Sequence, residues 1–122
     1  MSDPTDRRER GLERLRDLGD HPGGEAFLER MGEPMASWLV DWVFGEVHAR
    51  PRLSPREREL IILALLTGLG SSDPQVAAHI AALRAIDVPD DDIEEAILQT
   101  APYTGIPRAI NGLKVLRAEQ GR

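Results

Sequence analysis

Leu60-Ile61-Ile62-Leu63-Ala64-Leu65-Leu66 is the stretch that decides the fold. All of its residues are apolar, so hydrophobic periodicity alone does not separate a buried strand from a buried helix. The preceding residues favour a helix, because Ser54 suits the N-cap, Pro55 the first helical position and Glu57 the third. A helix that is apolar all round must be covered on every side. In a chain of 122 residues that cover often comes from a neighbouring subunit.

Helical patterns also run through the rest of the chain. Upstream, Pro34 suits the first residue of a helix that is predicted to end near Ala49, because the residue before Pro51 is pushed out of helical geometry. Downstream, a helix is predicted to begin at Pro89, with three aspartates at the end that the helix dipole makes positive. The other predicted helices cover residues 6–18, 25–31, 75–86 and 108–119.

These patterns predict an all-α fold, a small bundle of about six to seven helices in one compact domain. Residues 1–33 are predicted to be an N-terminal helical extension, and residues 34–122 the main helical domain. No stretch of the sequence favours a strand strongly enough to name one, and no internal repeat is evident.

Composition excludes several classes of function. The chain has no cysteine, which removes disulfides, thiolate nucleophiles and thiolate metal ligands. No segment approaches the ~20 apolar residues of a membrane span, and the N-terminus lacks an apolar signal core. The net charge is -6, and the arginines from Arg7 to Arg16 alternate with acidic residues, which is typical of a solvated helix face. We expect a cytoplasmic protein that binds neither nucleic acid nor membranes.

Six short motifs follow one another in order between Trp42 and Val115. They are Trp42-Val43-Phe44-Gly45, Arg50-Pro51-Arg52-Leu53, Arg58-Glu59-Leu60, His79 with Ala81-Ala82-Leu83, Asp92-Ile93-Glu94-Glu95 and Tyr103-Thr104-Gly105-Ile106-Pro107-Arg108-Ala109. Each motif is weak alone, but their order and spacing together resemble the carboxymuconolactone decarboxylase family. The resemblance implies an all-α, alkylhydroperoxidase-D-like fold and subunits that assemble into homotrimers or homohexamers.

The wider superfamily that the resemblance implies includes reductases with a Cys-x-x-Cys pair beside a histidine and a glutamate. His79 and Glu59 match the latter two residues, whereas the cysteine positions fall near Ser72 and Gln75. Without thiolates, peroxidase and disulfide-reductase chemistry are excluded. A second departure is the turn Arg84-Ala85-Ile86-Asp87, where the family usually has small residues or glycine. If that turn lines the pocket, the choice of substrate differs from that of the namesake reaction.

The reaction that names the family removes carbon dioxide from an unsaturated lactone acid and then protonates carbon. It needs a cation that orients the carboxylate, a donor for the lactone oxygen and an acid that delivers a proton. None of these tasks requires a metal or an organic cofactor, and the sequence offers no cluster of ligands for one. We therefore expect no cofactor.

His79 is the first candidate for the proton carrier. It lies in an otherwise apolar, alanine-rich helix, and histidine is the side chain that changes charge near neutral pH. The alternative is a structural histidine, hydrogen-bonded inside the bundle. Glu59 immediately precedes the apolar stretch, where a buried carboxyl group can exchange protons with His79. The alternative for Glu59 is a buried ion pair with Arg56 or Arg58.

Glu46, His48 and Arg50 form a second group of candidates near a predicted helix end. Glu46 and Arg50 lie four residues apart, so they can share a helix face and pair. In the functional interpretation Arg50 binds a substrate carboxylate, while Glu46 holds the arginine or acts as a catalytic base. The alternative is a surface ion pair that contributes little to stability. His48 is either a substrate-binding residue or an ordinary exposed histidine.

Aromatic residues supply the last candidates. Tyr103 lies in a predicted loop, where its hydroxyl group can donate to a developing oxyanion or its ring can pack and fix the loop. Trp38 and Trp42 lie four residues apart on one helix face, which favours a place in the core or a subunit interface over a stacking platform.

The leading functional hypothesis is a cofactor-independent decarboxylase or lyase that acts by proton transfer on a small lactone or carboxylate. A second hypothesis is a non-catalytic, oligomeric protein that binds small acids, suggested by the missing cysteines and the altered turn after His79. A third is a tailoring enzyme of secondary metabolism that uses the same groups on a larger substrate. Fold-level analogy favours decarboxylation but does not establish it.

Overall fold

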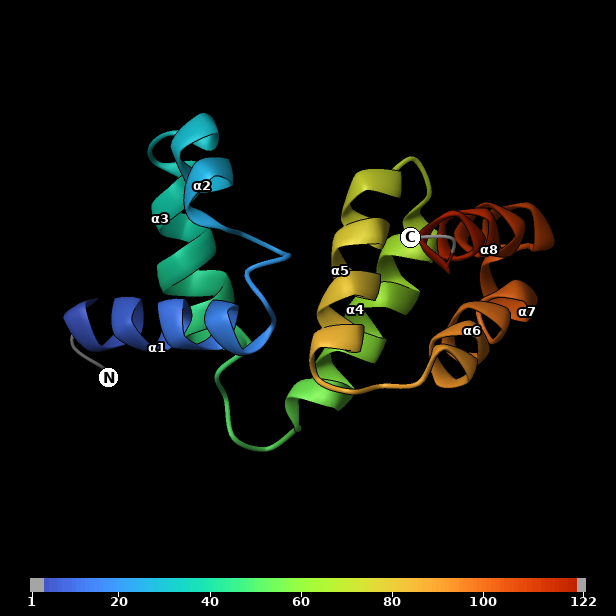
Figure 1. Ribbon diagram of the computed structural model, residues 1–122, viewed down its shortest axis with the longest axis horizontal. Helices are drawn as coiled ribbons and strands as arrows, with labels where there is room; N and C mark the ends of the chain where they lie inside the picture. Colours follow the sequence, from blue (N-terminus) through green and yellow to red (C-terminus); the bar gives the residue numbers. More distant parts are fainter. Residues whose placement is uncertain (1–3, 121–122) are drawn as a thin grey trace. The chain divides into compact units, whose positions relative to one another are not determined.

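The computed structural model describes residues 4–120, and all regular elements in that range are helices (Figure 1). They are α1 (Pro4–Asp17), α2 (Glu25–Met31), α3 (Met35–Ser37), the π-helix η1 (Trp38–Val47), α4 (Pro55–Leu69), α5 (Asp73–Ala85), α6 (Asp90–Leu98), α7 (Ala101–Thr104) and α8 (Ile106–Gln120). The predicted all-α class is confirmed. None of the helices in the described range is both long enough and apolar enough to cross a bilayer.

Contacts divide the chain into two compact units, Met1–Pro55 and Arg56–Arg122. The first unit contains the described elements from α1 to η1, and the second contains almost all of α4 and the elements from α5 to α8. Residues 1–33, the predicted extension, therefore belong to the same unit as η1.

The first unit is organised by a close crossing of α1 and η1. A Cβ atom on Gly11 would overlap the carbonyl oxygen of Val40, and one on Gly45 would overlap that of Arg7. Glycine lets the two backbones approach this closely because it has no Cβ atom. The apolar interior of this unit is small and consists of Leu15, Leu18, Val40 and Phe44.

The single helix predicted from Pro34 to about Ala49 is instead the short helix α3 followed by η1. In η1 the backbone bonds reach five residues back, as where the His48 N–H donates to the Val43 carbonyl oxygen at 2.8 Å. Such π-helical turns are rare and depend on tertiary context more than on residue propensity. Hydrophobic periodicity therefore predicts roughly where this helical segment begins and ends, but not that most of it is a π-helix.

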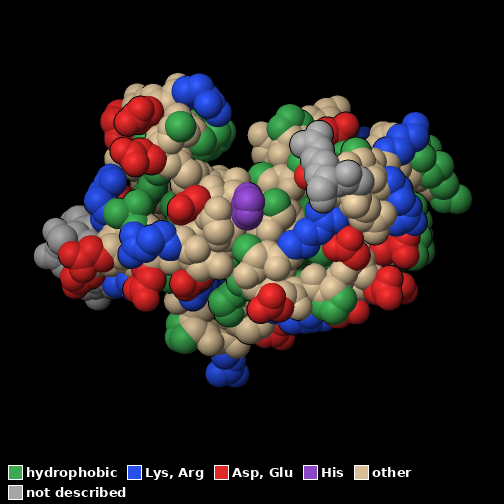
Figure 2. Space-filling model, in the orientation of Figure 1, with side chains coloured by type: hydrophobic (Ala, Val, Ile, Leu, Met, Phe, Trp, Pro, Cys, Tyr) green, Lys and Arg blue, Asp and Glu red, His purple; other side chains and the backbone are tan. Residues whose placement is uncertain are grey.

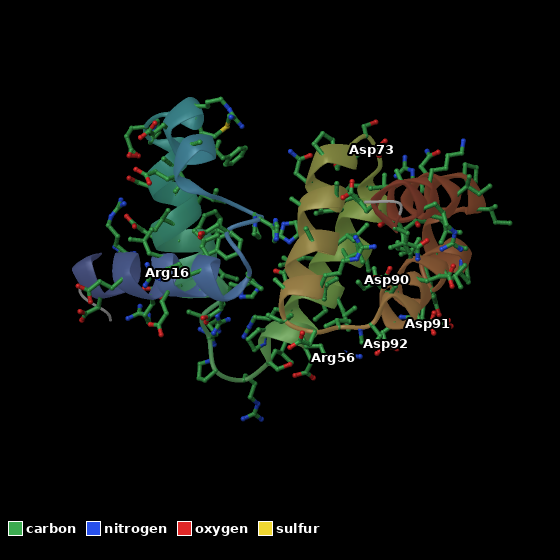
Figure 3. The ribbon with its side chains drawn as sticks, in the orientation of Figure 1. Arg16, Arg56, Asp73, Asp90, Asp91 and Asp92 are labelled. Carbon is green, nitrogen blue, oxygen red and sulfur yellow. The ribbon has the colours of Figure 1, made fainter. Side chains whose placement is uncertain are left out.

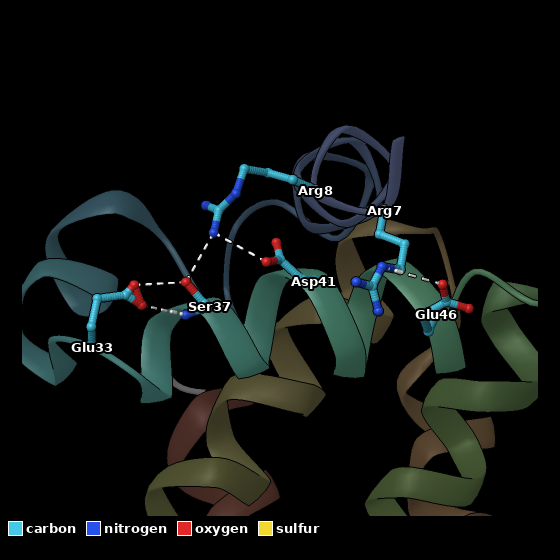
Figure 4. A network of polar contacts seen from close by, with 6 residues as sticks. All are labelled: Arg7, Arg8, Glu33, Ser37, Asp41 and Glu46. Carbon is cyan, nitrogen blue, oxygen red and sulfur yellow. Dashed lines mark hydrogen bonds and ion pairs between the residues drawn. The ribbon is translucent and has the colours of Figure 1, made fainter. Parts of the chain in front are cut away.

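Polar contacts also join α1 to the end of α3 and to the first turn of η1 (Figure 4). Arg8 donates to the Ser37 hydroxyl oxygen at 3.0 Å and to a carboxylate oxygen of Asp41 at 3.2 Å. Ser37 in turn donates its hydroxyl and its backbone N–H to the carboxylate of Glu33, at 2.6 and 2.9 Å. The two bonds from Ser37 lower the pKa of Glu33. In the space-filling view acidic and basic side chains alternate over α1, as expected of a solvated mixed-charge face (Figure 2).

The second unit has a larger aliphatic core, made by α4, α5, α6, α8 and the turn before α6. Its buried members are Leu63, Val76, Ile80, Leu83, Val88, Ile93, Ile97 and Leu116. The predicted start of α4 is confirmed, because that helix begins at Pro55; the N-cap role of Ser54 stays a prediction. At the other end of the unit Gly105, with a φ of 104°, separates α7 from α8, so the predicted loop before residue 108 is largely helical.

Only one face of α4 is covered within this unit. Glu59, Leu63 and Thr67, spaced four residues apart, are its buried residues. Ile61, Leu65 and Leu69 are 48, 61 and 69% exposed. In the apolar stretch from Leu60 to Leu66, Leu63 is buried, Ile61 and Leu65 are exposed, and the other residues are partly buried.

Candidate active site

Glu59 and His79 meet in the core of the second unit. Glu59 is placed by the first turns of α4, on the same buried face as Leu63. His79 comes from α5, where its neighbours Val76, Ile80 and Leu83 are buried. The His79 Nδ1 atom lies 2.6 Å from the Glu59 Oε1 atom. The carboxylate is 0% exposed and the imidazole 13% exposed, so little water screens this contact.

The contact determines which imidazole nitrogen is available for chemistry. With Glu59 ionised, the short bond is made by Nδ1–H donating to the carboxylate oxygen. In the neutral ring Nε2 is then the proton acceptor, and in the charged ring it is the atom that can give a proton away. A histidine and a carboxylate arranged in this way can carry a proton to or from a bound molecule.

Arg56, one of the two alternative partners considered for Glu59, is engaged with another carboxylate. It binds Asp92 at the start of α6, with 2.6 Å between the Nη2 and Oδ2 atoms (Figure 3). This pair is exposed and joins the first turns of α4 and α6.

Glu46, in the first unit, lies beside α1. Its carboxylate oxygen is 3.5 Å from Arg7 Nε and 3.6 Å from Arg10 Nη2 (Figure 4 shows the first of these pairs). Arg50 follows η1 as an exposed residue, and its backbone N–H donates to the Val47 carbonyl oxygen at 3.3 Å. The roles predicted for Glu46 and Arg50 remain predictions.

The interpretation of His48 as an ordinary exposed histidine is wrong, because its side chain is only 2% exposed. Its ring stacks on Phe44, with 5.3 Å between the ring centroids. Arg14 Nη1 lies 2.8 Å from the His48 Nδ1 atom and donates to the His48 carbonyl oxygen at 2.5 Å. Since a guanidinium group only donates, Nδ1 accepts this bond and the proton of the neutral ring is on Nε2. Arg14 was missed in the sequence because it precedes His48 by 34 residues.

The structure also excludes one of the alternatives considered for each group of aromatic residues. Tyr103 is 84% exposed in α7, so its ring does not pack against the fold as the structural alternative required. Trp38 and Trp42 are exposed on η1 and do not belong to the core. Their predicted place in a subunit interface stays a prediction.

The model of the carboxymuconolactone decarboxylase family matches residues 33–118, which include Glu59 and His79. The chain belongs to this family. It is 30% identical over 80 residues to a 4-carboxymuconolactone decarboxylase of Acinetobacter baylyi, covering 66% of this chain and 59% of that protein. It is 29% identical over 82 residues to the nitrosuccinic acid decarboxylase npaB of Metarhizium robertsii, covering 67% and 57%. The alignments thus span less than three fifths of the length of these curated relatives.

The turn that departs from the family pattern has a structural role in this member. Arg84 donates to both carboxylate oxygens of Asp90, at 2.8 and 2.9 Å, and also to the Glu119 carbonyl oxygen at 3.3 Å. It therefore connects the end of α5 with the start of α6 and the end of α8. These hydrogen bonds raise the pKa of Arg84 and lower that of Asp90.

Ser72 and Gln75, near which the family resemblance predicts the cysteine positions to fall, are polar residues at the start of α5. Ser72 is the N-cap residue of α5, and its hydroxyl donates to the Gly70 carbonyl oxygen at 3.1 Å. Gln75 is exposed in the first turn. Within residues 4–120, no group of three or more His, Asp or Glu side chains is arranged to hold a metal ion.

Proposed function

We propose that this chain is a cofactor-independent decarboxylase of small carboxylic acids, with His79 as the proton carrier and Glu59 as the residue that orients it. The 2.6 Å contact between the His79 ring and the buried Glu59 carboxylate supports this proposal most directly. The family match over residues 33–118 supports the type of reaction. The names of the two relatives supply the first substrates to test, 4-carboxymuconolactone and nitrosuccinic acid.

The proposed reaction has two steps. The bond between carbon and the departing carboxylate breaks, carbon dioxide leaves, and the electron pair moves into the lactone or the nitro group. His79 Nε2 then delivers a proton to carbon and is reprotonated from solvent, so one proton is consumed for each carbon dioxide released. Glu59 orients the ring through its contact with Nδ1.

The test is a turnover assay with each of the two acids, in which carbon dioxide release is followed for the wild type and for His79→Gln. The matched control is His21→Gln, which changes an exposed histidine outside the family match. We expect release that His79→Gln reduces by about 100-fold or more, the scale of a general acid, and that His21→Gln leaves unchanged.

Two results would contradict the proposal. Equal turnover by the wild type and His79→Gln would remove His79 from the mechanism. No release of carbon dioxide from either acid by the folded wild type would reject decarboxylation of these substrates. If the same acids then raised the melting temperature, the non-catalytic ligand-binding hypothesis would replace it.

A further inference from the structure

A hollow of about 540 Å³ lies within the first unit, between α1, α2 and α3. Most of the residues that line it precede Glu33, where the family match begins, so the hollow is built mainly by the segment outside that match. It belongs to a different unit from Glu59 and His79. Concave sites of about 300–1,000 Å³ are the size that binds small molecules.

The interior of the hollow is aliphatic. Leu12, Leu28 and Ala36 line it, and each of them is partly buried. Gly23 and Gly32 form further parts of the wall and present only backbone. Among the described residues that line it none is aromatic, so it lacks the ring faces that recognise quaternary ammonium groups. A ligand with a flexible hydrocarbon chain gains most from such an interior, because it buries its methylene groups there.

The edge of the hollow is acidic. Its exposed charged side chains are those of Asp20, Glu25, Glu29 and Glu33, against one basic residue, Arg16. Hydrogen bonds from Ser37 lower the pKa of Glu33, which keeps that carboxylate ionised. The other three carboxylates make no side-chain hydrogen bond or ion pair with any described residue. Free carboxylates around an aliphatic interior complement a molecule in which hydrocarbon segments join ammonium groups.

The placement of the carboxylates favours an extended cation over a metal ion. In residues 4–120 no three acidic side chains, those of the hollow included, converge closely enough to hold a metal ion. Charges that are spread along an edge are better matched by a ligand whose own charges are spread out. The small carboxylic acids of the proposed reaction are anions, which the same edge repels.

We propose that this hollow is a binding site for a linear aliphatic polyamine, with methylene segments against Leu12 and Leu28 and ammonium groups at Glu25 and Glu29. Because α1, α2 and α3 all contribute to the hollow, the bound polyamine joins these three helices and stabilises the first unit. The site does not depend on the proposed decarboxylation.

The first test is isothermal titration calorimetry of the full chain with spermidine at constant ionic strength. Hexaamminecobalt(III) is also trivalent, but it is compact and has no hydrocarbon, so it is the control for charge alone. Burial of two methylene groups is worth about tenfold in affinity, and we therefore expect the cobalt complex to bind at least about tenfold more weakly than spermidine. Equal affinities, or no binding of spermidine at millimolar concentration, would overturn the proposal.

The second test compares two double variants that remove the same number of charges. Glu25→Gln with Glu29→Gln changes the edge of the hollow, whereas Glu9→Gln with Glu13→Gln changes exposed positions of α1 that do not line it. An exposed ion pair is worth roughly two- to fivefold in affinity, so the first double variant should raise the Kd for spermidine about tenfold. The second should change it by less than about twofold. Equal weakening by the two would show attraction to the acidic chain as a whole and would reject the site.

Discussion

Replacing His79 by alanine and Glu59 by glutamine, singly and together, gives a double-mutant cycle that isolates the bond between these two side chains. Glutamine keeps the size of Glu59 and one acceptor oxygen, but it removes the charge. The loss of packing when His79 becomes alanine occurs both in the single and in the double variant, so it cancels in the cycle.

The structure sets the expected size of the coupling. The bond is short, at 2.6 Å, and joins a carboxylate that is 0% exposed to an imidazole that is 13% exposed. Solvent therefore screens it little, and a hydrogen bond to a charged group contributes about 1.5–3 kcal/mol to stability. We expect a coupling free energy in that range, equivalent to a factor of about 10–150 in the unfolding equilibrium.

The assay is urea unfolding at neutral pH, followed by far-ultraviolet circular dichroism because the described fold is helical throughout. The slope of unfolding free energy against urea must be the same for the four proteins, since a changed slope would indicate a different unfolding reaction. A coupling free energy below about 0.5 kcal/mol, the usual error of additivity, would refute the view that the two side chains form a strong pair shielded from solvent.

Three further predictions concern the second unit. Hydrogen bonding to Arg84 lowers the pKa of Asp90. The pair therefore stabilises the fold fully above the unfolded-state pKa of Asp90, and this contribution is lost as pH falls through the folded-state pKa. Asp90→Asn should flatten the acid side of a plot of melting temperature against pH. Arg108 donates to the Gly68 and Leu69 carbonyl oxygens at the end of α4, so Arg108→Ala should lower the unfolding free energy by about 1 kcal/mol in urea unfolding, and a neutral result would contradict this role. The Thr67 hydroxyl is buried without a hydrogen-bond partner, and Thr67→Val should therefore raise the unfolding free energy by about 1 kcal/mol; calorimetry that shows destabilisation would contradict this.

Local signals in the sequence were enough to predict much of the helical framework. The start of α4 at Pro55 follows from a cap and a proline within a few residues, and α2 begins and ends where glycines bound it. The π-helical form of η1 was not predictable in this way. It occurs where α1 crosses at Gly11 and Gly45, and the close contacts of that crossing, Gly11 with Val40 and Arg7 with Gly45, join residues about thirty to forty positions apart in the sequence.

The candidate site was likewise predictable only in part. Residue type and position suggested that Glu59 and His79 exchange protons, and the structure places the two side chains in contact. His48 looked like a surface residue because nothing near it in the sequence indicates burial. Its cover comes from Arg14 and Phe44, and only the folded first unit brings Arg14 to it.

The crossing of α1 with η1 also affects where the chain can be cut to make a fragment for experiments. The family match begins at Glu33, so a fragment cut to that boundary would keep η1 and discard α1. It would leave Val40 and Phe44 facing water, and His48 would lose the guanidinium group of Arg14. For this protein, the segment that sequence comparison leaves outside the family is needed to complete the interior of the segment that it includes.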